Sequence, residues 1–162
     1  AAGLGEMGRH NLLVADRYGT RVRIGAVTTN APLRHGAPTS RGVHRFCDAC
    51  HKCADNCPSQ ALSNGAPEDV RGVARWPTHS ERCYGYWRKV GTDCGVCMAV
   101  CPFSHRNTRV HNLLRELVKR APWLATFMVH ADNLVYGREW PGRFRGEREG
   151  HSGSSDRSGE TP

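Results

Sequence analysis

All eight cysteines of this 162-residue chain lie between residues 47 and 101, in two runs. The first run holds Cys47, Cys50, Cys53 and Cys57, and the second holds Cys83, Cys94, Cys97 and Cys101. A proline follows the last cysteine of each run. The pattern C-x2-C-x2-C-x3-C-P is typical of bacterial iron–sulfur proteins, because thiolates on such tight turns can converge on one inorganic centre. The spacing therefore predicts two 4Fe-4S clusters.

The same pattern predicts how the cysteines divide between the clusters. In proteins with two clusters, the fourth cysteine of each run ligates the other cluster. Cluster 1 is then expected to bind Cys47, Cys50, Cys53 and Cys101, and cluster 2 to bind Cys57, Cys83, Cys94 and Cys97. Every cysteine is used and none is left over.

Two other uses of the cysteines are less consistent with this spacing. Four-cysteine zinc sites pair C-x2-C units across a longer spacer and need neither a third cysteine nor a following proline. Zinc stays an alternative on the residues alone. A disulfide framework would spread its bridges over a small secreted fold, whereas both ends of this chain lack cysteine.

A glycine pattern near the N-terminus could be mistaken for a dinucleotide site. Gly3, Gly5 and Gly8 spell G-x-G-x-x-G. That fingerprint needs a strand before it, a helix after it and a carboxylate at the end of the next strand. The strand expected at 21–28 leads into Thr28, Thr29 and Asn30, which carry no carboxylate. We therefore disfavour a nicotinamide or flavin site.

Composition excludes some functions and supports few. The net charge of +8 comes mostly from arginine, with 20 Arg against three Lys, but no basic block and only 7% aromatic residues accompany it. We expect no nucleic-acid partner. The nine histidines are dispersed without an H-x3-H or H-E-x-x-H unit, which favours solvated or hydrogen-bonded histidines. No apolar run is long enough to span a bilayer.

Periodicity and turn residues predict the elements of the first half. We expect a short helix at 11–16, a half-buried strand at 21–28 and a loop at 30–43. The cysteine runs at 46–62 and 83–104 are expected to form cluster-binding turns, each followed by a short helix.

The second half holds clearer helical signals. Between the cysteine runs, a loop at 63–77 carries Trp76. Apolar residues at helical spacing predict an amphipathic helix, with Val110, Leu113, Leu114, Leu117 and Val118 on one face. A second helix is expected at 122–136, ended by Gly137. The Gly-, Ser- and Arg-rich residues 141–162 are expected to be disordered.

Residues flanking the cysteines carry a more specific resemblance. Residues 3–33, 46–62 and 75–104 resemble the C-terminal part of corrinoid-dependent reductive dehalogenases. The most specific stretches are C-Y-G-Y-W from Cys83 and C-G-V-C-M-A-V-C-P-F-S from Cys94. Epoxyqueuosine reductase, a related corrinoid enzyme, shares the layout but has a Y-x-T-I-E-like stretch after the first cysteine of its second run, so the dehalogenase is favoured.

The resemblance implies an α+β fold in four parts. These are the end of a nitroreductase-like cobalamin-binding core (1–43), a ferredoxin-like domain with two 4Fe-4S clusters (44–106), C-terminal helices (107–140) and the tail (141–162). Electrons would pass through the clusters to cobalamin, whose reduced cobalt removes halogen from an organohalide. We expect the chain to be part of a larger enzyme, inactive alone, with its tyrosine proton donor upstream of Ala1.

Several site residues follow from the resemblance alone. Gly3, Gly5, Gly8, Thr28, Thr29 and Asn30 would cradle the cobalamin. Trp76 would be an aromatic wall of the substrate pocket or an ordinary core tryptophan. Arg9 would assist the proton donor as a catalytic cation or contact solvent or phosphate.

Partners and location follow from the family in the same way. The electron donor would be reduced ferredoxin, a quinol-linked donor or a reductase. Respiratory members act on the outer face of the cytoplasmic membrane after twin-arginine export, with a small membrane-anchor protein, and other members are cytoplasmic. A plain two-cluster electron carrier is the alternative, but the glycine-rich 45 residues before Phe46 argue against it.

Overall fold

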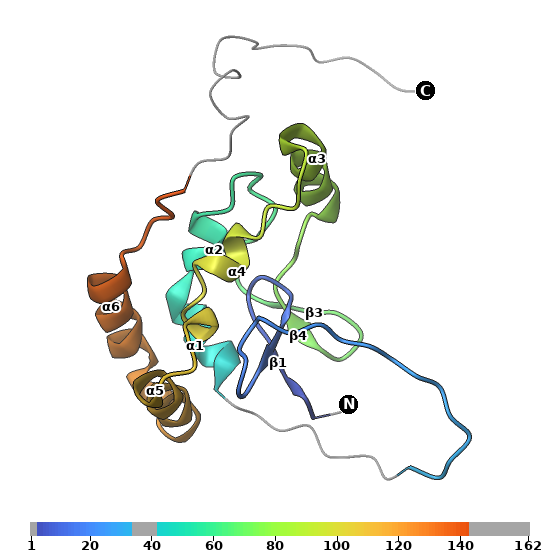
Figure 1. The fold of residues 1–162 in the computed structure, drawn as a ribbon, viewed down its shortest axis with the longest axis horizontal. Coiled ribbons are helices and arrows are strands. Elements are labelled where there is room, and N and C mark those ends of the chain that lie inside the picture. Colours follow the sequence, from blue (N-terminus) through green and yellow to red (C-terminus); the bar gives the residue numbers. More distant parts are fainter. Residues whose placement is uncertain (1–2, 34–41, 143–162) are drawn as a thin grey trace.

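The computed structural model describes residues 3–33 and 42–142, which form two short β-hairpins and six α-helices. In chain order the elements are β1 (Gly5–Met7), β2 (Leu13–Ala15), α1 (Val43–Cys50), α2 (Lys52–Asp55), β3 (Glu68–Asp69), β4 (Ala74–Arg75), α3 (Ser80–Val90), α4 (Val96–Ala99), the 3-10 helix η1 (Pro102–Ser104), α5 (Arg109–Arg120), the 3-10 helix η2 (Pro122–Leu124) and α6 (Ala125–Tyr136). Figure 1 shows α5 and α6 together along one side, with α1, α2 and α4 in the middle. Helix α3, which has no buried residue, projects from the rest.

The glycine-rich N-terminus is a β-hairpin. β1 and β2 pair antiparallel, with Gly5 opposite Ala15, and the Gly8 N–H donates to the Leu12 carbonyl at 3.0 Å across the turn. A Cβ at Gly5 would lie 2.2 Å from the Val14 carbonyl oxygen, so this approach of the two strands requires glycine. The helix expected at 11–16 is wrong, because residues 13–15 pair with β1 and bury Val14 instead.

The strand expected at 21–28 is also wrong. These residues have no regular secondary structure, and the side chains of Ile24 and Val27 are 63% and 93% exposed. An alternating sequence forms a strand only where another strand pairs with it, and the described residues offer this segment none. Most of the loop expected at 30–43 lies outside the described residues, as does nearly all of the tail expected at 141–162.

Helix α1 connects the hairpin to the C-terminal helices. Gly42 precedes it at φ 72°, where a Cβ would lie 2.7 Å from the Val118 carbonyl oxygen. The first helical N–H, on Val43, donates to a carboxylate oxygen of Glu6 in β1 at 2.8 Å. An acidic side chain at this end also complements the helix dipole. Helix α1 packs against β1, α5 and α6.

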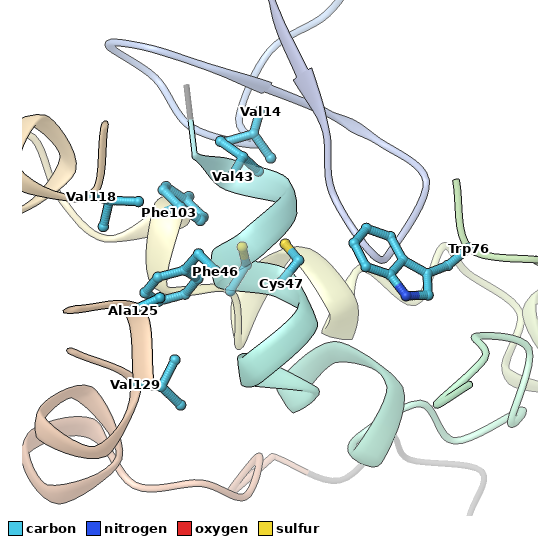
Figure 2. Packing of buried hydrophobic residues seen from close by; sticks show 10 residues of the cluster. Val14, Val43, Phe46, Cys47, Trp76, Phe103, Val118, Ala125 and Val129 are labelled. Atoms are coloured by element: carbon cyan, nitrogen blue, oxygen red, sulfur yellow. The ribbon is translucent and has the colours of Figure 1, made fainter. Parts of the chain in front are cut away.

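The buried core is built around α1. It comprises Val14, Val43, Phe46, Cys47, Trp76, Cys101, Phe103, Val118, Ala125 and Val129. The rings of Phe46 and Phe103 meet edge to face with centroids 4.9 Å apart. In Figure 2, Cys47 lies between these phenylalanines and Trp76, which is at the edge of the cluster. Two cysteines are therefore part of the core itself.

The segment between the cysteine runs is more regular than expected. No helix follows the first run. Leu62 instead bridges Thr78, and β3 pairs with β4 within the region 63–77 that the sequence predicts as a loop. The prediction of a helix after the first run is wrong. The second run is followed by η1 and then α5, as expected.

Helices α5 and α6 form where the sequence predicts helices. Most of the apolar face expected on α5 is not buried. The Thr108 hydroxyl accepts from the His111 N–H at 3.3 Å and caps α5, and Gly137 ends α6. Of the five expected apolar residues in α5 only Val118 is buried, and Leu113 is 68% exposed. Among the described residues, no helix combines the length and hydropathy needed to cross a bilayer.

Arg115 holds α5 against the segment after the last cysteine. It is 7% exposed and donates to the carbonyl oxygens of Phe103 at 3.1 Å and His105 at 2.6 Å. It also donates to the Asn107 side-chain oxygen at 2.7 Å. One guanidinium thus donates to three acceptors in the segment 103–107, of which the Phe103 carbonyl is in a fully buried hydrogen bond.

Gly19 offers a test of how tightly the hairpin packs on η1. It has φ 59°, and a Cβ there would lie 1.7 Å from the Phe103 carbonyl oxygen. We expect Gly19→Ala to cost about 3 kcal/mol or more in unfolding free energy, because it adds a backbone clash to the left-handed strain. The control is Gly72→Ala, since Gly72 has φ 76° and open space around it. Its cost should be about 1–2 kcal/mol, and equal losses measured by denaturant unfolding would contradict the predicted clash.

Candidate metal centre

None of the eight cysteines is in a disulfide, and electrostatic neighbours divide their thiols into two sets of four. Cys101 interacts with Cys47, Cys53 and Cys50. Cys97 interacts with Cys57, Cys94 and Cys83. An electrostatic interaction between Cys53 and Cys97 links one set to the other. The first set is therefore Cys47, Cys50, Cys53 and Cys101, and the second is Cys57, Cys83, Cys94 and Cys97, the same division that the crossed spacing predicts.

The first set lies in the core. Cys47 and Cys50 are one helical turn apart on α1, Cys53 is on α2, and Cys101 comes just before η1. His51 separates the first two helices at φ 55°, which turns the chain so that the next cysteine faces the same region. All four thiols line one small cavity.

Burial keeps the thiols of this set protonated when no metal is bound. It raises the pKa of Cys47 to about 12 and that of Cys101 well above its usual value. Burial also raises the pKa of Cys53, and electrostatic interaction with the neighbouring cysteines raises it further. Since thiolates are the ligands, iron binding must displace these protons, so metal binding and proton release are coupled.

The second set is closer to solvent. Cys83 is on the exposed helix α3, Cys97 is on α4, and Gly95 at φ 64° makes the turn between Cys94 and α4. Burial and the neighbouring Cys57, Cys94 and Cys83 raise the pKa of Cys97 to about 11. The backbone N–H of Ala61 donates to the Cys57 sulfur at 3.3 Å. Backbone N–H groups directed at sulfur are among the features that set cluster potentials.

The donor set fits two 4Fe-4S clusters. Each set supplies four thiols and no other ligand type, as such clusters require. Within the described residues, no three His, Cys, Asp or Glu side chains gather closely enough to bind one metal ion. A 4Fe-4S cluster distributes its four thiolates over four iron atoms, so its ligands need not converge on a single point. Which cysteines bind which cluster stays a prediction.

Arg9 is buried against the first set. Its side chain is 1% exposed, and the guanidinium donates to the carbonyl oxygens of Cys47 at 3.0 Å, Ser63 at 2.9 Å and Gly65 at 3.1 Å. It also lies over the Trp76 ring, 4.7 Å from the centroid. Its donors are thus used within this chain, and its catalytic role stays a prediction.

Trp76 is 1% exposed and belongs to the core. The His44 imidazole stacks on its ring at a centroid distance of 4.3 Å. In this structure Trp76 therefore packs between side chains of the chain itself, and its place in a substrate pocket stays a prediction. Figure 2 shows that it lies beside the helix that carries Cys47.

The residues predicted to cradle cobalamin are not brought together. The Val14 backbone occupies the space beside Gly5. Gly8 packs against the His10 ring, and a Cβ on Gly8 would lie 2.8 Å from that ring. Thr28, Thr29 and Asn30 are exposed and have no regular structure. The described residues do not by themselves form a corrinoid pocket, so cobalamin stays a prediction from the family.

A buried ion pair ties the first cysteine run to α6. Lys52, between Cys50 and Cys53, is 3% exposed and pairs with Asp132, which also accepts from His105 at 2.7 Å. Burial alone would raise the pKa of Asp132, but the hydrogen bonds from His105 and Lys52 outweigh it and hold that pKa below its usual value. The sequence gives no local sign of this pair, because its members are 80 residues apart.

Removing one partner of this pair should be costly. We expect Asp132→Asn to lower the unfolding free energy by about 3–5 kcal/mol, because it leaves the buried Lys52 ammonium without its counter-charge. Lys52→Met should cost less, because Asp132 keeps its hydrogen bond with His105. The double variant should lose less than the sum of the two, as a double-mutant cycle would show. Additive losses would contradict a direct interaction. Lys119→Met, at a partly exposed ion pair with Asp16, is the control and should cost at most about 1 kcal/mol.

Comparison with known proteins identifies the relatives of this arrangement. The family model for the 4Fe-4S dicluster domain matches residues 46–105. The tetrachloroethene reductive dehalogenase of Sulfurospirillum multivorans is 35% identical over 157 residues, which cover 88% of this chain and 31% of that protein. This chain is a homologue of the reductive dehalogenases. It carries two 4Fe-4S clusters in its dicluster domain.

Solved structures agree with this assignment. A structure described as the catabolic reductive dehalogenase NpRdhA in complex with 3-bromo-4-hydroxybenzoic acid superposes on this dehalogenase homologue with a TM-score of 0.75 and 29% identity, covering 84% of this chain and 20% of that one. The epoxyqueuosine reductase of Lactococcus garvieae is 30% identical over 108 residues, 64% of this chain and 30% of that protein. The dehalogenase homologue thus spans less than a third of the relatives named here.

The comparisons confirm the main predictions from the sequence. The resemblance to reductive dehalogenases, the mixed α and β content and the ferredoxin-like dicluster domain are all borne out. The sequence did not predict the buried and partly buried side chains around the first cysteine set, including Lys52, Asp132 and His10. No local signal in the sequence points to these residues, because their roles depend on contacts made by the fold.

Proposed function

We propose that this chain carries electrons through its two 4Fe-4S clusters to cobalamin in an enzyme that reductively removes halogen from an organohalide. The supporting observation is that similarity to the tetrachloroethene enzyme covers 88% of the chain, well beyond the dicluster domain at 46–105. The chain outside the dicluster domain contains the β1–β2 hairpin, whose Arg9 and His10 line the cavity of the first cysteine set. A plain electron carrier has no need of such a segment.

Burial favours one direction of electron flow. The second set includes Cys83 on exposed α3, so a donor can approach its cluster. The first set is in the core beside the hairpin, and the interaction between Cys53 and Cys97 brings the two sets together. We therefore place electron entry at the second cluster and exit from the first cluster toward the hairpin.

Cobalamin would supply the chemistry that breaks the carbon–halogen bond, and the protein supplies electrons and orientation. In the overall reaction, two electrons and one proton replace the halogen by hydrogen and release a halide ion. The electron donor we propose is reduced ferredoxin, a quinol-linked donor or a reductase. A small membrane-anchor protein is a further proposed partner.

The test uses the enzyme encoded by the reading frame that contains this chain, reconstituted with iron, sulfide and cobalamin under anaerobic conditions. Halide release from aryl and alkyl halides with a strong reductant is the expected result. We expect the 162-residue chain alone to bind iron but to release no halide. Reduction of epoxyqueuosine without halide release from any substrate would overturn the proposal in favour of the tRNA-modifying relative.

A further inference from the structure

His10 is a buried histidine with one ring nitrogen in use. It is 4% exposed, and its Nδ1 accepts a hydrogen bond from the Leu12 backbone N–H at 3.1 Å. A ring nitrogen that accepts carries no proton, so the neutral imidazole holds its proton on Nε2. The second nitrogen is therefore a hydrogen-bond donor.

That donor has no partner in the part of the chain that the structure describes. The Nε2 atom of His10 is buried without a hydrogen bond. A buried donor left unsatisfied costs about 1–3 kcal/mol, so such groups normally have a partner. Gly8 allows the ring to lie here, because a Cβ on that residue would be 2.8 Å from Cε1 and 3.2 Å from Nε2 of His10.

The ring lines the cavity that the first cysteine set surrounds. Cys47, Cys50, Cys53 and Cys101 all line this cavity together with His10. Arg9 and Lys52 line it too, but the first binds backbone carbonyls and the second pairs with Asp132. His10 is thus the lining side chain that offers a buried donor without a partner.

We propose that Nε2 of His10 donates a hydrogen bond to a sulfur of the cluster held by the first set. His10 would be a positioning residue that raises the reduction potential of this cluster. The reduced cluster carries one more negative charge than the oxidised one, so an N–H donor stabilises it more. The proposal concerns cluster 1 alone and holds whether or not the enzyme binds cobalamin or acts on organohalides.

The variant His10→Asn separates this bond from the structural one. The asparagine Oδ1 can take the place of Nδ1 and accept from the Leu12 N–H, but no atom reaches the position of Nε2. In the full chain with both clusters assembled, an EPR-monitored redox titration should show one cluster about tenfold harder to reduce, a shift of about 59 mV for one electron. The potential of the other cluster should not change.

Pulsed EPR supplies a direct readout. With 15N-histidine, the reduced wild-type chain should show a 15N coupling and an exchangeable proton coupling to one cluster, and both should vanish in His10→Asn. Restoration of the potential by His10→Gln, whose side-chain N–H reaches farther, would support the role. The control His44→Asn removes another buried, unpartnered Nε2, on a histidine outside the lining of this cavity, and should change neither potential.

Two results would overturn the proposal. Unchanged potentials in His10→Asn would show that no sulfur depends on this donor. Absence of the 15N coupling in the wild-type chain would show the same, and it decides the question even if the variant fails to assemble its clusters.

Discussion

Replacing Cys101 by alanine is expected to remove the cluster bound by Cys47, Cys50 and Cys53 and to leave the other cluster in place. Cys101 is the last cysteine of the second run in sequence, but its thiol is buried and interacts with those three cysteines of the first run. Iron and sulfide should fall to half of the wild-type content. Any EPR broadening from interaction between the two reduced clusters should disappear, leaving the spectrum of one.

Paired variants show which cluster is lost. Adding Cys47→Ala to Cys101→Ala should remove no further iron, because both residues bind the same cluster. Adding Cys83→Ala should remove the remaining half. The matched control is Cys57→Ala, which should remove the other cluster, so that adding Cys83→Ala to it costs no more iron. If Cys101→Ala and Cys83→Ala together still left half of the iron, the crossed assignment would be wrong.

Arg9→Met is expected to destabilise the protein by about 3–6 kcal/mol. The substitution preserves much of the side-chain volume but leaves the carbonyl oxygens of Cys47, Ser63 and Gly65 without this donor. The bond to the Cys47 carbonyl is fully buried, and a buried acceptor without a partner costs about 1–3 kcal/mol. Loss of the two part-buried bonds and of the cation–π contact with Trp76 adds to this. Anaerobic denaturant unfolding, followed by the visible absorbance of the clusters, measures the effect.

Two further variants test this explanation. Arg9→Lys should recover only part of the loss, because a single ammonium lacks the planar fork that reaches several acceptors. Arg21→Met is the control, since Arg21 donates to the His105 carbonyl at 3.0 Å in an exposed position. It should cost less than about 1 kcal/mol. Equal stability of the Arg9→Met and Arg21→Met proteins would exclude a structural role for Arg9.

The sequence predicts best what depends on nearby residues. The cysteine spacing led to the two clusters because ligands on a tight turn are close together whatever the rest of the chain does. Helices α5 and α6 follow from apolar residues at helical spacing and from Gly137 at the end of α6. These features need no knowledge of distant contacts.

The failures involve segments whose structure depends on a partner. Leu13–Ala15 has an apolar sequence that suits either a helix or a strand. It forms a strand because it pairs with β1, where Gly5 permits a close approach of the two backbones. The alternating residues at 21–28 have no neighbouring strand in the described chain. The pairing of Lys52 with Asp132 likewise joins residues far apart in sequence.

The two buried arginines have a consequence for the speed of electron transfer. Arg9 fixes the carbonyl of Cys47, and Arg115 fixes the carbonyls of Phe103 and His105 just after Cys101. The backbone is thus held at both ends of the first ligand set. A cluster whose ligands cannot shift when its charge changes has a small reorganisation energy, so an electron can leave it with little rearrangement of the protein. Removing the hydrogen bonds of either arginine would slow this electron transfer even where the cluster and its reduction potential are preserved.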